Sequence, residues 1–170
     1  MIILDGKSLD LEKFIQIARF KEEVSISEES KLLVIKARKF VDEVVESEKP
    51  VYGINTGFGA LYNVEIKGEN LQKLQENLVM SHACGTGDEV SNEIVKLMLL
   101  LKIQSLSYGY SGVQLATVNR LIDFYNNDIF PVVYEQGSLG ASGDLSPLAH
   151  LALPLIGLGE VKFKGERISG

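Results

Sequence analysis

The chain gathers its smallest side chains in one place, directly before a helical pattern, and sets a carboxylate after them. The stretch reads Gly140-Ala141-Ser142-Gly143-Asp144. If the main chain bends tightly here, the amide nitrogen of Gly143 can approach the carbonyl carbon of Ala141, because glycine has no Cβ to block the approach. Ring closure and loss of the Ser142 hydroxyl, with two waters released, would leave a five-membered ring that bears an exocyclic methylene. That methylene is an electrophile of a kind that no ordinary side chain provides.

Proximity and the following helix both favour this chemistry. Strained intramolecular alignment raises the effective concentration of reacting groups by many orders of magnitude. A helix that begins near Asp144 points unpaired N–H groups and the positive end of its dipole toward the ring. An ordinary glycine-alanine loop with Asp144 as the helix N-cap has the same spacing. From spacing alone, the ordinary loop is the better interpretation.

Composition limits the kinds of partner. The chain has 170 residues, 45% of them hydrophobic, and a net charge of −6, which argues against a nucleic-acid partner. Cys84 is the only cysteine, so there is no disulfide framework, and a reducing cytoplasm is expected. No apolar run is long enough to span a membrane. Two histidines and one cysteine at unsuitable spacings predict no metal site.

The pattern of apolar residues predicts a mainly α, single compact unit over residues 1–170. The helices are expected at about 10–19, 25–48, 69–81, 90–108, 113–126 and 144–158, with a kink at Pro154 and a final β-hairpin over 161–168. Ser25 and Glu28 suggest a capping box for the second helix. The apolar stripe expected on that helix comprises Leu33, Ala37, Phe40, Val41, Val44 and Val45.

Four stretches, in order, resemble the aromatic amino acid ammonia-lyase family. They are "YGINTGFG" (52–59), "NLVMSHACGTG" (77–87), "LKIQSLSYGYSG" (101–112) and "GSLGASGDLSPLAHLAL" (137–153). The resemblance covers essentially the whole chain, and the last stretch is a highly specific signature. In that family the Ala-Ser-Gly sequence forms the 4-methylidene-imidazol-5-one (MIO) electrophile. The resemblance thus implies the helical N-terminal part of the aromatic amino acid lyase fold, and it reverses the preference for an ordinary loop.

The resemblance also implies roles for individual residues. Ala141, Ser142 and Gly143 would form MIO without an external cofactor or metal, and Asp144 would assist the cyclisation. Tyr52 matches the tyrosine proposed to take the β-proton of the substrate. A tyrosine hydroxyl is normally protonated at neutral pH, so its surroundings would have to favour the anion.

Substrate contacts are implied at two further positions. His82 matches the residue that contacts the substrate side chain, and an imidazole there can hydrogen-bond either another imidazole or a phenol hydroxyl. Gly59, in the glycine-rich loop, would let the backbone lie close to the ligand.

The pair Ser81-His82 and the histidine at His150 most resemble the histidine-specific branch of the family. The implied reaction is non-oxidative elimination of ammonia from L-histidine, which gives urocanate. Two alternatives stay open: a tyrosine ammonia-lyase or aminomutase on the same scaffold, and a non-catalytic fragment or assembly module whose loop does not cyclise. Family members are homotetramers, so a homo-oligomer is implied. They are also much longer, so we expect a truncated chain that has little activity alone.

Overall fold

The computed structural model describes residues 1–170 apart from 8, 21, 48, 67 and 138–142. Ala141 and Ser142 therefore lie outside the described residues. The α-helices are α1 (Leu11–Phe20), α2 (Glu28–Glu46), α3 (Glu69–His82), α4 (Asn92–Ser107), α5 (Leu115–Asn126) and α6 (Leu145–Ala152), with short 3-10 helices η1 (Gly59–Leu61) and η2 (Leu153–Ile156). The strands are β1 (Ile2–Leu4), β2 (Val24–Ile26), β3 (Thr86–Glu89), β4 (Phe130–Pro131), β5 (Tyr134–Gln136), β6 (Glu160–Phe163) and β7 (Glu166–Ser169). The mainly α prediction is confirmed.

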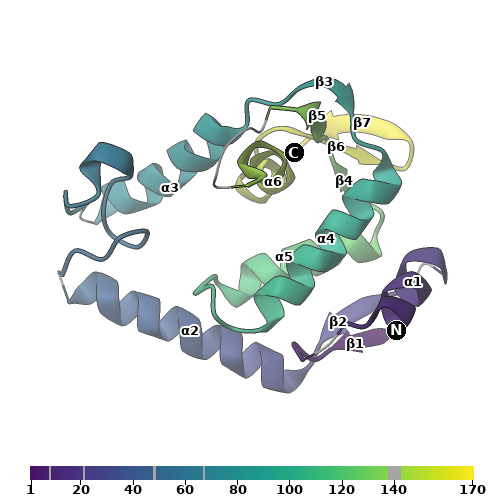
Figure 1. Ribbon diagram of the computed structural model, residues 1–170, viewed down its shortest axis with the longest axis horizontal. Helices are drawn as coiled ribbons and strands as arrows, with labels where there is room; N and C mark the ends of the chain where they lie inside the picture. The colour runs from purple at the N-terminus through teal and green to yellow at the C-terminus, as the bar shows by residue number, and fades with distance from the viewer. Residues whose placement is uncertain (8, 21, 48, 67, 138–142) are drawn as a thin grey trace.

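The core is centred on the pair α4 and α5, which lie side by side in the middle of the molecule (Figure 1). Helix α4 is apolar around most of its circumference, and such a helix is stable only when it is covered on several sides. The elements α5, α2 and β4 pack against α4 and supply that cover. The buried apolar residues of α4 are Val95, Leu99, Leu100, Ile103 and Leu106.

The first strands form a small parallel unit on one side of this core. β1 pairs with β2 in parallel, and α1 provides the crossover between them. The side chain of Asn126, at the end of α5, binds the main chain of Val24 from the other side. Its Oδ1 accepts the Val24 N–H at 2.9 Å, and its Nδ2 donates to the Val24 carbonyl at 3.0 Å. One side chain thus satisfies both main-chain groups of a residue in β2.

The predicted capping box on α2 is wrong in its register. The N-cap is Ser27, whose hydroxyl accepts the Ser30 N–H at 3.1 Å. Ser25 is in β2, where it is paired with Ile3 of β1. Because β2 continues to Ile26, the chain cannot enter the helix until two residues later than the motif suggested.

The apolar stripe predicted on α2 is confirmed only in part, because Ala37, Val41, Val44 and Val45 are half-buried. The buried residues of α2 are Ser30 and Val34, whereas Leu33 is 41% exposed and Phe40 is 62% exposed. Only the N-terminal part of the helix reaches the core. Its position there is set by Gly109, which has a φ of 73° and where a Cβ would lie 2.7 Å from the Leu33 carbonyl carbon.

The C-terminal elements follow the prediction closely. Pro154 ends α6, and the chain continues as the 3-10 helix η2 to Ile156. β6 and β7 form the predicted hairpin around Lys164 and Gly165, which have φ values of 52° and 83°. Positive φ at both turn residues matches the twist of the two strands. β6 also pairs with β4, so the hairpin is joined to the core.

The centre of α4 provides a test of this core. Leu99 is fully buried, and Leu99→Ala should lower the free energy of unfolding by about 2–5 kcal/mol, because the methyl groups that are removed leave a cavity. Leu101, two residues further along the same helix, is 51% exposed, and Leu101→Ala should change stability by less than about 0.5 kcal/mol. Urea denaturation followed by circular dichroism measures both values. Equal losses for the two variants would contradict the burial of Leu99.

Candidate active site

The segment that contains the Ala-Ser-Gly sequence is entered through a tightly packed glycine. Gly137 has a φ of 135°, and a Cβ at this position would lie 2.8 Å from the Gly85 Cα and 3.2 Å from the Cys84 carbonyl oxygen. The same Cβ would lie 3.0 Å from the hydroxyl of Ser146, in the first turn of α6. Only glycine lets these backbones approach so closely. The stem of the segment is therefore held between the α3–β3 connection and α6.

The segment is followed by Gly143 and Asp144. Gly143 has a φ of 86°, a conformation that favours glycine, and a Cβ there would meet no atom of the described residues within 4 Å. Asp144 occupies the N-cap position of α6, but its side chain makes no capping hydrogen bond. The helix itself begins at Leu145, close to the expected start. Gly143 and Asp144 thus stand at the positively polarised end of α6, as predicted.

His82 is the last residue of α3 and is half-buried. Its Nδ1 lies 2.7 Å from the Leu78 carbonyl oxygen and 3.2 Å from the Ser81 hydroxyl. A carbonyl oxygen only accepts, so Nδ1 carries a proton and donates it. In the neutral ring, Nε2 then has a lone pair, and it has no hydrogen-bond partner among the described residues. This side chain can accept a hydrogen bond from a ligand N–H or O–H.

His150, on the last turn of α6, has a different arrangement. Its Nε2 accepts the backbone N–H of Gly85 at 2.9 Å. The Tyr134 ring packs edge-on against the imidazole, with ring centroids 5.1 Å apart. Burial lowers the pKa of His150 from its usual value of 6.5. The sequence named His150 only as a marker of a branch of the family, whereas the structure gives it a partner 65 residues away.

Tyr52 and Gly59 lie in a structured loop before α3. The buried side chain of Asn55 holds this loop: its Oδ1 accepts the Val51 N–H at 2.7 Å, and its Nδ2 donates to the Lys49 carbonyl at 2.9 Å. Tyr52 is 62% exposed and packs edge-on against Phe58 at 5.7 Å. Gly59 begins η1 with a φ of 58°. Asn55 was not singled out from the sequence, although an asparagine in a glycine-rich loop is a common turn-forming residue.

The structure separates these two groups of candidate residues. The loop that carries Tyr52 and Gly59 lies at the N-terminal end of α3, and His82 lies at its C-terminal end, near α6 (Figure 1). The 14 residues of α3 span about 21 Å at a rise of about 1.5 Å per residue. Within one chain, α3 packs against α6 and carries His82 at its C-terminal end, but Tyr52 stays at the other end of the helix.

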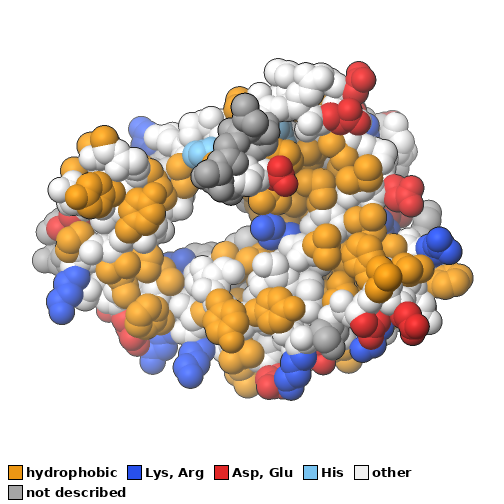
Figure 2. All heavy atoms as spheres, in the orientation of Figure 1, with side chains coloured by type: hydrophobic (Ala, Val, Ile, Leu, Met, Phe, Trp, Pro, Cys, Tyr) orange, Lys and Arg blue, Asp and Glu red, His pale blue; other side chains and the backbone are white. Residues whose placement is uncertain are grey.

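The loop and α3 form an arm, residues 51–82 apart from 67, with an apolar surface. Figure 2 shows an opening between this arm and the helical core, and hydrophobic side chains gathered on the arm. The exposed large hydrophobic residues of the arm include Tyr52, Leu61, Tyr62, Val64 and Met80. Exposed apolar patches of this kind commonly mark interaction surfaces.

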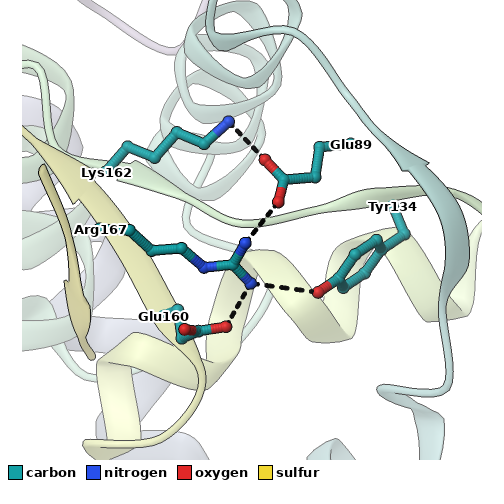
Figure 3. Close-up of polar contacts among 5 residues, drawn as sticks. All are labelled: Glu89, Tyr134, Glu160, Lys162 and Arg167. Carbon is teal, nitrogen blue, oxygen red and sulfur yellow. Dashed lines mark hydrogen bonds and ion pairs between the residues drawn. The ribbon is translucent and has the colours of Figure 1, made fainter. Parts of the chain in front are cut away.

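A network of charges joins the C-terminal hairpin to the strands beside the site (Figure 3). Glu89 accepts from Lys162 at 2.5 Å and from Arg167 at 2.6 Å, and these contacts lower the pKa of Glu89, with the Lys162 hydrogen bond as the largest cause. Arg167 also binds Glu160 and reaches the Tyr134 hydroxyl at 3.4 Å. Tyr134 is also the residue whose ring packs on His150, so the network contacts the imidazole through Tyr134.

The flanks of the 138–142 segment suit a tightly bent, ring-forming sequence. Gly137 is clamped on one side, and Gly143 adopts a left-handed conformation on the other. The Ser146 hydroxyl is buried beside Gly137 and has no partner among the described residues.

Within the part of the chain that the structure describes, no three His, Cys, Asp or Glu side chains gather as a metal site requires. None of its described helices is long and apolar enough to cross a membrane.

Comparison with known proteins places this geometry in a family. The model of the aromatic amino acid lyase family matches residues 9–170. The chain is 50% identical, over 169 residues, to the histidine ammonia-lyase of Clostridium tetani, covering 99% of this chain and 33% of that enzyme. The chain therefore spans about a third of the length of the curated relatives it matches.

Solved structures show the same fold. Ergothionase from Treponema denticola superimposes with a TM-score of 0.92 at 32% identity, covering 99% of this chain and 34% of that one. The phenylalanine aminomutase of Pantoea agglomerans gives a TM-score of 0.89 at 33% identity, covering 99% of this chain and 32% of that one. The family match, the sequence identity and the shared fold all agree, and the chain belongs to the aromatic amino acid lyase family.

Proposed function

We propose that the chain carries part of the active site of a histidine ammonia-lyase, an enzyme that eliminates ammonia from L-histidine to give urocanate. The main support is the position of His82: the end of α3 that bears it leads into Cys84 and Gly85, which pack against Gly137. Gly137 and α6 flank the 138–142 segment in the chain. The connection that follows His82, the residue proposed to contact the substrate side chain, therefore packs against Gly137, which precedes the Ala-Ser-Gly sequence.

His82 would distinguish histidine from other aromatic amino acids through the lone pair on its Nε2, which has no partner among the described residues. Because Nδ1 donates to the Leu78 carbonyl, Nε2 is oriented away from the helix end as an acceptor. The imidazole of a histidine substrate has an N–H to donate, whereas the side chain of phenylalanine has no donor. A tyrosine hydroxyl can also donate, so tyrosine is the closest competing substrate by this criterion.

Ala141, Ser142 and Gly143 would form the MIO group, with Asp144 beside it. When formed, this group supplies an electrophile that makes the substrate amine a better leaving group. The chain's own contribution is to hold the flanks: Gly137 is fixed by packing, and Gly143 supplies the positive φ. The unpaired N–H groups of the first turn of α6 favour negative charge that develops nearby.

Tyr52 would remove the β-proton of the substrate, but in a site formed with another copy of the chain. Within one chain α3 separates the loop of Tyr52 from His82, and the Tyr52 side chain is exposed. A homo-oligomer, with the apolar arm in its interface, brings a second chain's tyrosine to the electrophile. A tetramer is the state we propose for the assembled enzyme, which would act on a free amino acid in the cytoplasm.

Formation of the ring can be tested in a chimera in which residues 2–170 replace the matching third of the Clostridium tetani enzyme. The mass of the chimera should fall short of the encoded mass by two waters. Ser142→Ala should abolish this difference and reduce urocanate formation by about a thousandfold or more, because an essential group of a catalytic unit is lost. Ser111→Ala, in an exposed turn, is the control. An assembled chimera with the encoded mass and no turnover would support a non-catalytic module.

Substrate choice can be tested with the same chimera and a panel of histidine, tyrosine and phenylalanine. Histidine should be preferred. His82→Phe should lower kcat/KM for histidine relative to phenylalanine by about 5- to 150-fold, the effect of about 1–3 kcal/mol for an unpaired polar group. Met80→Leu, on the same turn of α3, should leave the preference unchanged. If tyrosine is the better substrate before any substitution, the tyrosine-specific alternative is correct.

A further inference from the structure

His150 holds the chain that follows His82 by a hydrogen bond that only one form of imidazole can make. Its Nε2 accepts the Gly85 N–H, so this nitrogen carries no proton, and in the neutral ring the proton is on Nδ1. An imidazolium has no acceptor, and protonation would break the bond. Burial favours the neutral ring and lowers the pKa of His150 below 6.5.

The contact is fixed by packing as well as by the hydrogen bond. A Cβ at Gly85 would lie 2.9 Å from the His150 Nε2 and 3.1 Å from the Tyr134 Cβ, so the site accepts only glycine without movement. Tyr134 covers the imidazole edge-on, and its hydroxyl is reached by Arg167. The ring is thus held between a backbone and an aromatic side chain that is itself tethered.

The backbone that His150 holds is the one against which Gly137 packs. Gly85 and Cys84 contact Gly137, and Gly137 stands four residues before Ala141. In the other direction, Gly85 stands three residues after His82. A shift of Gly85 would therefore move His82, which is proposed to contact the substrate side chain, relative to Gly137.

We propose that His150 is a positioning residue, whose Nε2 holds the Gly85 backbone and so sets the position of His82 relative to Gly137. This role rests on the proposed function. His150 is not assigned any contact with the substrate.

Other charges near α6 do not account for the state of His150. β5 brings Tyr134 and Glu135, and α3 brings His82 to this end of the helix, whereas β4 and η2 bring no titratable side chain. The lowered pKa of His150 is caused by burial and not by any of these groups. At His150 the unfolded chain therefore binds a proton more readily than the folded one. The contribution of His150 to the free energy of unfolding is fully present above pH 6.5 and is lost as the pH falls below that value.

Kinetics of the chimera test the positioning role. His150→Phe keeps an aromatic ring without an acceptor, and it should lower kcat/KM for histidine by about 10- to 100-fold, the cost of a small misplacement of a catalytic site. His150→Gln, whose amide oxygen can accept from Gly85, should restore most of that loss. In the His82→Phe background, His150→Phe should have much less effect, because the two positions act through one another. Equal losses for Gln and Phe, or additive effects of the two substitutions, would overturn the proposal.

Spectroscopy of the 170-residue chain tests the contact independently of activity. Nitrogen-15 spectra of the histidines should show the Nδ1–H form for His150, and a pKa below 6.5 in titration. The Gly85 amide should be protected from exchange, and should lose that protection in His150→Phe but not in His150→Gln. An Nε2–H form, or a Gly85 amide that is indifferent to both variants, refutes the contact. If the contact holds while the unsubstituted chimera releases no urocanate, the proposed function fails and the positioning role with it, but the contact remains.

Discussion

The candidate site depends on two positions where no side chain can be accommodated. At Gly85 and Gly137 the backbone of the α3–β3 connection contacts the backbone that follows β5. The imidazole of His150, on α6, binds the Gly85 N–H at the same place. A methyl group at either position would push these segments apart. The strand pair β3–β5 and the hydrogen bond of Arg167 to Tyr134 lie beside this contact, and α3 also packs directly against α6.

The fold was predictable from the sequence because its signals are local. The helical patterns, Pro154 and the alternation of the hairpin act on their own neighbours, and the helices, the end of α6 and the hairpin were confirmed. The start of α2 was not, because β2 pairs with a distant strand and so keeps Ser25 out of the helix. The stripe on α2 was right only in part, with Leu33 and Phe40 exposed, because a repeat of apolar residues predicts a face and does not identify what covers each residue.

The site was predictable only in part, for the same physical reason. The Ala-Ser-Gly signature and His82 stand out by residue type. The contact of His150 with Gly85 joins residues 65 positions apart, and the pairing of Glu89 with Arg167 joins residues 78 apart. No periodicity reports such contacts. The separation of Tyr52 from His82 along α3 is also a property of the fold, which the sequence pattern does not report.

The contact of Asn126 with β2 has a consequence for how the chain behaves among its neighbours. A two-stranded sheet leaves unpaired N–H and C=O groups along its outer edges, and such edges recruit strands from other molecules. Asn126 occupies both main-chain groups of Val24 on the outer side of β2 with a single amide. The outer edge of β2 is thereby blocked at Val24 against the addition of a strand from another molecule.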